Sequence, residues 1–185
     1  MRQVIVTEFL SLDGVIDSPG NGPHPHAGWT FKQVAFDAAA YEIKGREQLE
    51  ATALLLGRIS YDEFAPVWPT MAEFSEYNAM PKYVVSTTLR DPEWNNTSVL
   101  GSLDEVAALK ETEGGNILVH GSGTLAKALA AAGLVDRYHL LVFPVLLGEG
   151  RRLFDETGDR LQKLELVEHG AYSNGVVKAV YDVVR

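Results

Sequence analysis

The chain has 185 residues, 46% of them hydrophobic, and a mean hydropathy near zero, which is typical of an ordinary globular protein with one domain. It contains no cysteine, which excludes disulfides, thiolate catalysis, iron–sulfur clusters and cysteine-ligated zinc, the zinc deaminase site included. The net charge of -9 argues against non-specific binding to nucleic acid or anionic membranes, and no apolar run approaches the ~20 residues of a membrane span, so we expect a cytoplasmic protein.

Apolar and β-branched runs predict a series of strands separated by helix-like segments. In chain order these strands are 2–10, 52–57, 82–87, 97–101, 116–121, 136–148 and a final pair within 163–184. The final pair is expected to be joined around Asn174-Gly175, the commonest signal of a two-residue hairpin. Residues 11–29 are rich in glycine and proline and predict a long loop, and such loops are more often functional than idle.

Helices are predicted between these strands. Residues 33–51 have a helix-forming composition. The S-x-x-E pattern at Ser60 and again at Ser102 predicts two capping boxes, each opening a further helix. Another helix is expected from about Thr124 to Ala132, with the next residue, Gly133, as its C-terminal glycine.

The alternation of strands and helices predicts the α/β class. We expect a single domain over residues 1–185, built on a mainly parallel twisted sheet flanked by helices. The C-terminal hairpin is expected to add an antiparallel edge to that sheet.

The stretch NILVHGSGTLA (116–126) combines a strand, a glycine turn and the start of a helix. Its glycines fit the pattern G-x-G-x-x-A, in which backbone amides and a helix N-terminus bind a pyrophosphate. A glycine-rich turn without a ligand is the alternative, because the pattern is common by chance. A Rossmann site also needs an acidic residue about 20 positions further on, at the end of the next strand. Residues 140–145, LLVFPV, contain no acidic residue, and Asp136 comes before the strand begins. The pattern therefore does not predict a Rossmann unit.

Two other predicted strands end in residues that suit a phosphate. Gly57-Arg58 ends one strand, and an arginine fork matches phosphate oxygens, including the 2′-phosphate that separates NADP from NAD. Ser86 and Thr87 end another, where turn formation explains their hydroxyls equally well. Ligands of open α/β sheets bind beyond the carboxyl ends of strands, so the three strand ends together predict a nucleotide site.

The long loop offers weaker signals. Asp13-Gly14 favours a tight turn, and Gly14 would let a flat ring approach the backbone, although an ordinary turn explains it equally well. His24 and His26 lack a third metal ligand nearby in the sequence, so an exposed polar loop is preferred and no metal site is expected. No Ser-His-Asp order or H-E-x-x-H motif supports hydrolysis.

Taken in order, these segments resemble the dihydrofolate-reductase-like superfamily, and most closely the reductase domain of bacterial riboflavin-biosynthesis proteins. SLDGVID (11–17) resembles the S-x-D-G segment, LLLGRISYDEF (54–64) the G-R-x-[ST]-[YW] segment, and YVVSTTL (83–89) the next cofactor strand. Residues 117–154 are similar to the pattern G-G-x-x-L, then G-L-V-D-E, then P-x-x-x-G-x-G-x-x-L-F. The chain departs from the family at His120, in the first place of G-G, and at Val15, in place of a substrate-side lysine.

The resemblance implies an NADPH-dependent reductase that forms a homodimer. Its substrate would be a small heterocycle or a ribosyl-pyrimidine such as 5-amino-6-(5-phosphoribosylamino)uracil. The implied cofactor-binding residues are Leu12, Asp13, Gly14 and Val15 near the nicotinamide, Gly57, Arg58, Ser60, Ser86 and Thr87 near the adenosine phosphate, and His120, Gly121, Ser122, Gly123 and Thr124 near the pyrophosphate.

Hydride transfer also needs a proton donor. Dihydrofolate reductases use an acid on the helix after the first long loop; Asp37 lies in that region, with Glu42 as an alternative. A solvated carboxylate on a helix is the competing interpretation. The rival to an enzyme is a non-catalytic nucleotide-binding or sensory module on the same fold.

Overall fold

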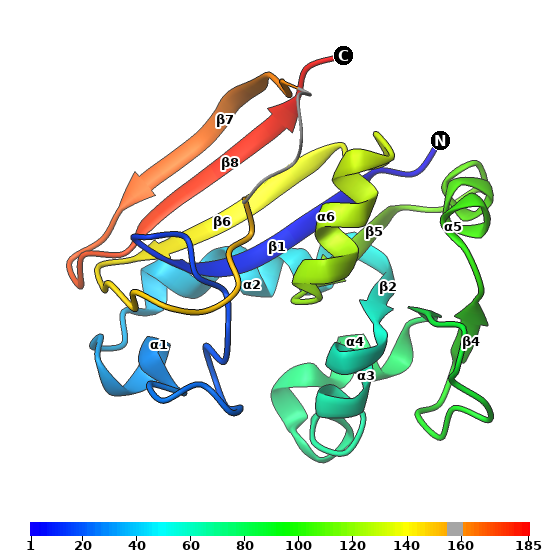
Figure 1. Ribbon diagram of the computed structural model, residues 1–185, viewed down its shortest axis with the longest axis horizontal. Coiled ribbons are helices and arrows are strands. Elements are labelled where there is room, and N and C mark those ends of the chain that lie inside the picture. Colours follow the sequence, from blue (N-terminus) through cyan, green and yellow to red (C-terminus); the bar gives the residue numbers. More distant parts are fainter. Residues whose placement is uncertain (155–160) are drawn as a thin grey trace.

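The computed structural model describes residues 1–154 and 161–185 as one α/β unit (Figure 1). Within these residues a single eight-stranded sheet has the order β4-β3-β2-β5-β1-β6-β8-β7. The strands are β1 Val4–Ser11, β2 Ala51–Gly57, β3 Lys82–Val85, β4 Thr97–Leu100, β5 Asn116–His120, β6 Arg137–Phe143, β7 Leu164–Ala171 and β8 Val177–Val183. The strands from β4 to β6 pair in parallel, and β8 runs antiparallel to both of its neighbours. The predicted fold class is therefore confirmed.

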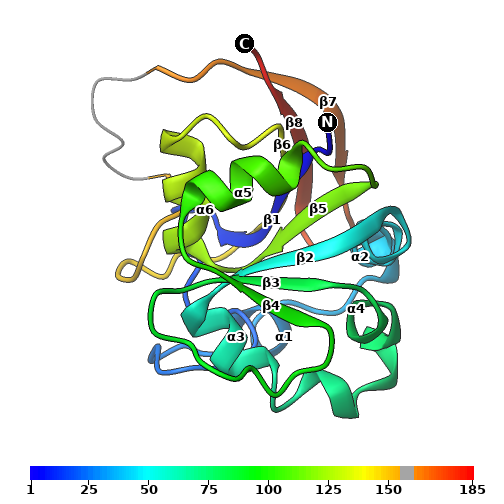
Figure 2. The same ribbon diagram turned by 90° about the vertical axis from the view of Figure 1, so that its right-hand side faces the viewer.

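Helices cover both faces of the sheet, as Figure 2 shows. They are α1 Trp29–Lys32, α2 Ala38–Glu50, α3 Arg58–Phe64, α4 Ser75–Ala79, α5 Leu103–Lys110 and α6 Gly123–Ala131, with short 3-10 turns at Trp68–Thr70 and Ala72–Phe74. One core cluster joins α5 and α6 to the face of β1 that carries Val4, Val6 and Leu10. The opposite face, marked by Ile5 of β1, packs under α3 and α4, and α2 covers the same face nearer β6.

Two of the three helix ends predicted from capping residues are confirmed by local hydrogen bonds, and one is wrong. The hydroxyl of Ser102 accepts from the N–H of Glu105 (3.3 Å), so this predicted cap is confirmed. Gly133 has a left-handed φ of 69° directly after α6, and the N–H of Leu134 reaches back to the carbonyl of Leu129 (2.9 Å). The capping box at Ser60 is wrong, because α3 begins immediately after β2 and Ser60 already lies inside it.

Other boundaries also differ from the sequence-based prediction, and the strand expected over 82–87 ends at Val85. The helix expected over 33–51 is α2 alone and begins at Ala38. The strand expected over 136–148 ends at Phe143, because Pro144 follows it and cannot donate to a ladder. The final hairpin closes through a bond from the N–H of Tyr172 to the carbonyl of Val176 (3.0 Å), so its loop has three residues rather than two.

The sheet order separates this fold from a Rossmann unit. In a Rossmann unit the strand that follows the glycine turn and its helix pairs with the strand before them. Here the strand that follows β5 and α6 is β6, and β6 is separated from β5 by β1. The neighbouring parallel strands β3, β2, β5 and β1 all end at one edge of the sheet. The loops that follow these four strands therefore meet at that edge, which we call the carboxyl edge.

Candidate functional site

The glycine turn after β5 is joined directly to the end of β2. Gly121 and Ser122 both adopt left-handed φ values, of 61° and 66°. Ser122 is the N-cap residue of α6, yet its hydroxyl does not cap the helix and instead accepts the N–H of Gly57 at 2.9 Å. No side chain therefore caps the N-terminus of this nine-residue helix within the described chain, and its first amides are available to an anion.

Close approach explains Gly123, because a Cβ atom on it would lie only 2.1 Å from Cδ1 of Ile16, in the long loop. Cβ atoms on Gly121 and Gly57 would make ordinary contacts, at 3.5 Å from the Ser60 hydroxyl and 3.6 Å from Cβ of Ser122. Gly121 is instead favoured by its left-handed φ. The turn thus places backbone amides at the N-terminus of α6, an arrangement that suits phosphate groups, and we call residues 121–124 the pyrophosphate cradle.

Arg58 lies between the ends of β2 and β3. Its guanidinium pairs with Asp62 one turn along α3, at 2.8 Å, and its Nη1 atom lies 3.5 Å from the Thr88 hydroxyl. The Ser86 hydroxyl accepts the N–H groups of Thr88 (3.2 Å) and Leu89 (3.0 Å), so it builds the turn after β3. Arg58 and the hydroxyls after β3 are therefore brought together, with Asp62 as a competitor for the guanidinium.

The loop after β1 is fixed by Asp13. Its carboxylate accepts the Ser11 hydroxyl (2.6 Å) and the N–H groups of Leu147 (3.1 Å) and Gly148 (2.8 Å). The hydrogen bond from Ser11 is the main reason that the pKa of Asp13 falls to about 2, and the two backbone bonds act in the same direction. Asp13 thereby ties the S-x-D-G segment to the segment after β6, and its contact with a cofactor stays a prediction.

Further backbone contacts join residues 14–16 to residues 151–153. Val15 is buried and forms a β-bridge with Arg152, and the N–H of Ile16 donates to the carbonyl of Arg151 (2.9 Å). Gly14 has a φ of 81°, a conformation that favours glycine. Leu12 stays 67% exposed at the carboxyl edge, where it is open to a ligand.

His120 ends β5 among aromatic rings. Ring centroids of Phe64, Trp68 and Tyr77 lie 5.8, 5.1 and 5.9 Å from the His120 ring. Its Nδ1 atom is buried and, in the described part of the chain, has no hydrogen-bond partner. Burial, supported by the charge of Lys44, lowers the pKa of His120 to about 3, so the ring is neutral near pH 7.

A buried polar network lies beneath α2, and sequence reasoning missed it. Glu47 accepts the Thr7 hydroxyl (2.7 Å), lies 2.9 Å from Nδ1 of His139 and pairs with Lys44 (3.3 Å). Burial raises the pKa of Glu47, but Lys44, His139 and Thr7 together outweigh it and lower the pKa to about 2. These residues come from α2, β1 and β6, and no local pattern relates them.

Asp37 is the N-cap residue of α2. Its carboxylate accepts the N–H of Ala39 (3.0 Å) and the hydroxyl of Ser173 (2.6 Å), in the hairpin loop. The bond from Ser173 lowers the pKa of Asp37, which leaves the exposed carboxyl ionised near neutral pH. Glu42 is exposed on α2. The assignment of either acid as proton donor stays a prediction, while capping accounts for Asp37 in full.

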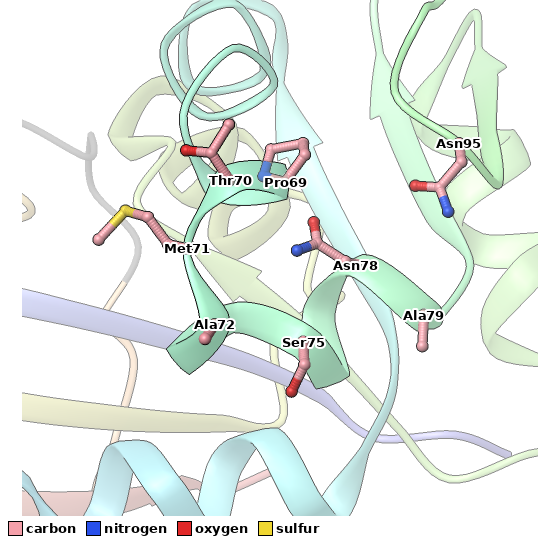
Figure 3. A pocket seen from close by; sticks show the side chains of 8 residues that line it. All are labelled: Pro69, Thr70, Met71, Ala72, Ser75, Asn78, Ala79 and Asn95. Atoms are coloured by element: carbon pink, nitrogen blue, oxygen red, sulfur yellow. The ribbon is translucent and has the colours of Figure 1, made fainter.

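Two open hollows lie beside α3 and α4. The first, of about 510 Å³, is shown in Figure 3 and is lined by Pro69, Thr70, Met71, Ala72, Ser75, Asn78, Ala79 and Asn95. The second, of about 790 Å³, lies between α3 and residues 89–95. Neither is lined by any residue predicted to bind the cofactor.

Two further features bear on function. In the described residues there is no group of three or more His, Cys, Asp or Glu side chains that would hold a metal ion. The ring of His24 is instead bonded to the carbonyl of Glu149 (3.1 Å) and the N–H of His26 (3.1 Å). No helix in the described chain has the length and apolar character needed to cross a membrane.

Comparison with protein families matches residues 2–178 to the family described as RibD C-terminal domain. Among curated proteins, the chain is 28% identical over 190 residues to the uncharacterised protein YyaP of Bacillus subtilis (strain 168). That alignment covers 97% of this chain and 94% of YyaP.

Three solved structures are similar over nearly the whole chain. A candidate riboflavin biosynthesis protein from Shewanella sp. PV-4 has a TM-score of 0.76 and 22% identity, with 99% of each chain covered. A pyrimidine reductase-like protein from Corynebacterium diphtheriae has a TM-score of 0.63 and 13% identity, covering 100% of this chain and 92% of that one. Dihydrofolate reductase from Enterococcus faecalis, complexed with NADP(H), has a TM-score of 0.63 and 15% identity, covering 99% and 97%. At these identities the likeness shows the fold, and it confirms the dihydrofolate-reductase-like fold expected from the sequence.

Proposed function

The chain belongs to the RibD C-terminal domain family, and we propose that it is an NADPH-dependent reductase that transfers hydride to a small heterocyclic or ribosyl-pyrimidine substrate. One observation carries this proposal. The loops after β3, β2, β5 and β1 meet at one edge of the sheet, where the Gly57–Ser122 hydrogen bond joins the two central loops. The NADP(H) complex of dihydrofolate reductase from Enterococcus faecalis, on the same fold, supports the choice of cofactor.

Each loop has its own part in holding the cofactor. The amides of Gly121 to Thr124, at the N-terminus of α6, would hold the pyrophosphate. Arg58 would bind the 2′-phosphate beside the hydroxyls of Ser86 and Thr87, in exchange for part of its pairing with Asp62. The segment from Leu12 to Val15, fixed by Asp13, would lie against the nicotinamide.

The cofactor supplies the hydride, so the protein has to align it with the substrate and keep water out. The rings of Trp68 and Tyr77 around His120 are only 6% and 1% exposed, so they form a buried, water-free support next to the pyrophosphate cradle. Because the family match is to the RibD C-terminal domain, the pyrimidine 5-amino-6-(5-phosphoribosylamino)uracil is the first substrate to test. We also propose a homodimer, by analogy with the family.

Intrinsic tryptophan fluorescence tests the proposal, because the Trp68 ring lies 5.1 Å from that of His120. Titration with NADPH should give a saturable change, and NADPH should then be oxidised in the presence of the pyrimidine. Binding without oxidation across pterins, flavin precursors and quinones would instead support the non-catalytic module. No change up to millimolar NADPH would contradict both functions.

A further inference from the structure

Glu8, on β1, carries a buried carboxyl group next to the pyrophosphate cradle. The pairing of β1 with β5 ends at Thr7 and His120, whereas the pairing of β1 with β6 continues to Ser11. Glu8 is therefore the first residue of β1 that has no partner on the β5 side, and it lies level with the turn that begins at Gly121. It stands at the gap that opens between β1 and β5.

The carboxyl group of Glu8 is buried and incompletely bonded. The residue is 5% exposed, and in the described part of the chain its buried Oε1 atom has no hydrogen-bond partner. Buried polar atoms without partners are rare because each costs about 1–3 kcal/mol. An apolar residue at this position would stabilise the folded state more. The carboxyl group therefore calls for a functional explanation.

Among the described residues Glu8 forms no ion pair. Lys44 and Arg151 influence it only through space, because Lys44 is bonded to Thr7 and Glu47, and Arg151 is paired with Asp17 at 2.6 Å. The residues of α6 that pack on this face of the sheet, such as Leu125 and Leu129, are apolar.

Burial is the largest influence on the protonation of this group. It raises the pKa of Glu8 to about 8, against the opposing charges of Lys44 and Arg151. His120, the nearest titratable residue on β5, is neutral near pH 7 and adds no charge. Glu8 is therefore largely protonated at neutral pH.

We propose that Glu8 is the proton donor of the reduction, acting from the gap between β1 and β5. The proposal rests on the proposed reductase function and replaces Asp37 in that role. In the step, the substrate carbon of a C=O or C=N bond accepts hydride, and the electron pair of the double bond moves to the oxygen or nitrogen. That atom takes the proton of Glu8. The substrate is reduced, the cofactor is oxidised, and the Glu8 carboxylate later regains a proton from water.

A proton donor of the reduction has to lie close to the nicotinamide, so its protonation responds to the charge of that ring. The oxidised nicotinamide ring carries a positive charge, which favours ionised Glu8, whereas the reduced ring is neutral and leaves the carboxyl group protonated. Linkage then requires that NADP⁺ binds more tightly as Glu8 ionises, while NADPH does not. This coupling is measurable without any substrate.

The experiment measures the dissociation constants of NADP⁺ and NADPH from about pH 6 to about pH 9.5, by tryptophan fluorescence, in the wild type and in Glu8→Gln. Glu165→Gln, at an exposed position on β7, is the matched control. In the wild type and the control, NADP⁺ affinity should rise about tenfold for each unit by which NADP⁺ lowers the pKa of Glu8. In Glu8→Gln this rise should be absent, and NADPH affinity should change little at any pH.

Three results would overturn the assignment. If Glu8→Gln keeps the pH dependence of the wild type, another group is responsible while the reductase proposal stands. If the wild type binds neither nucleotide, the reductase proposal fails and the role of Glu8 falls with it. Should Glu8→Gln not fold, infrared difference spectra of the wild type decide: NADP⁺ must remove a protonated-carboxyl band that NADPH leaves in place, and an unchanged band refutes the proposal.

Discussion

The backbone N–H of Gly57 donates a 2.9 Å hydrogen bond to the hydroxyl of Ser122, 65 residues further along the chain. This bond joins the end of β2 to the turn after β5, the two loops that meet at the centre of the carboxyl edge. It also takes the Ser122 hydroxyl away from the N-terminus of α6, where a serine would ordinarily cap the first amides. The helix end is thereby left open for a ligand, and the neighbouring loop is held at a fixed distance.

Ser122→Ala should therefore weaken NADPH binding by about fivefold and reduce stability by about 1 kcal/mol, because the amide of Gly57 loses its acceptor. Ser102→Ala is the matched control, since Ser102 caps α5 by an ordinary bond to Glu105. That variant should lose about 1 kcal/mol of stability with unchanged NADPH affinity. Urea denaturation and fluorescence titration measure both quantities, and equal effects on binding in the two variants would refute the role of Ser122.

Arg58→Ala should weaken NADPH by at least about tenfold and NADH much less, because only NADPH carries the 2′-phosphate. Asp62→Asn should have the opposite effect. It releases the guanidinium from a 2.8 Å ion pair, so NADPH should bind more tightly. Isothermal titration calorimetry measures the six affinities of the wild type and the two variants for NADPH and NADH. Equal losses for NADPH and NADH in Arg58→Ala would rule out contact with the 2′-phosphate.

Gly123→Ala should destabilise the fold by about 1–3 kcal/mol, because its Cβ atom would lie 2.1 Å from Cδ1 of Ile16. Ile16→Val in the same chain should recover part of that loss by shortening the side chain. Gly45→Ala is the control, as nothing lies within 4 Å of its Cβ position on α2, and it should stabilise by about 0.5–1 kcal/mol. Thermal unfolding measures all three, and an unchanged melting temperature in Gly123→Ala would show that the loop moves away at no cost.

The free energy of unfolding should depend on pH between about 2 and 4.5 through the ionisation of Glu47. Its pKa is about 2 in the folded protein and 4.5 without the fold, so the folded state favours the ionised form. Its contribution is present above about pH 4.5 and is lost as the pH falls toward about 2. Urea unfolding over this range should show a smaller acid loss in Glu47→Gln than in the wild type, although that variant is less stable at neutral pH. Parallel curves would contradict the lowered pKa.

Glu8 should act in the opposite direction. Its pKa rises from 4.5 to about 8 on folding, so the folded state binds the proton more tightly. Stability should therefore fall as the pH rises from about 4.5 to about 8, and Glu8→Gln should remove that decline. The same urea measurements test it. If the wild type instead gains stability as the pH rises across this range, and the stability of Glu8→Gln stays constant, Glu8 is ionised in the folded protein throughout the range.

The parts of the fold that were predictable depend on contacts between residues close in sequence. The cap at Ser102 and the glycine after α6 follow from neighbours within one helical turn, and both were found. Ser60 shows the same S-x-x-E pattern as Ser102, yet α3 starts directly at the end of β2 and leaves no room for a cap there. A capping pattern alone therefore does not locate a helix start.

The contacts among the polar residues near β1 could not be predicted, because these residues are far apart in sequence and only the folded sheet brings them together. Glu47 bonds to Thr7 across 40 residues and to His139 across 92. The one signal available in the sequence was Glu8, a carboxylate in the middle of the apolar run VIVTEFL (4–10). A charge at a strand position with buried neighbours on both sides is a reason to look for a functional group.

Amide chemical shifts during an NADPH titration of the isotope-labelled protein test the central claim most directly. The nucleotide site at the carboxyl edge predicts saturable shifts at Gly57 and Arg58, at Ser86 and Thr87, and at residues 120–124, which follow β2, β3 and β5. The absence of shifts up to millimolar NADPH, or shifts confined to the hollow at residues 69–79, would contradict it.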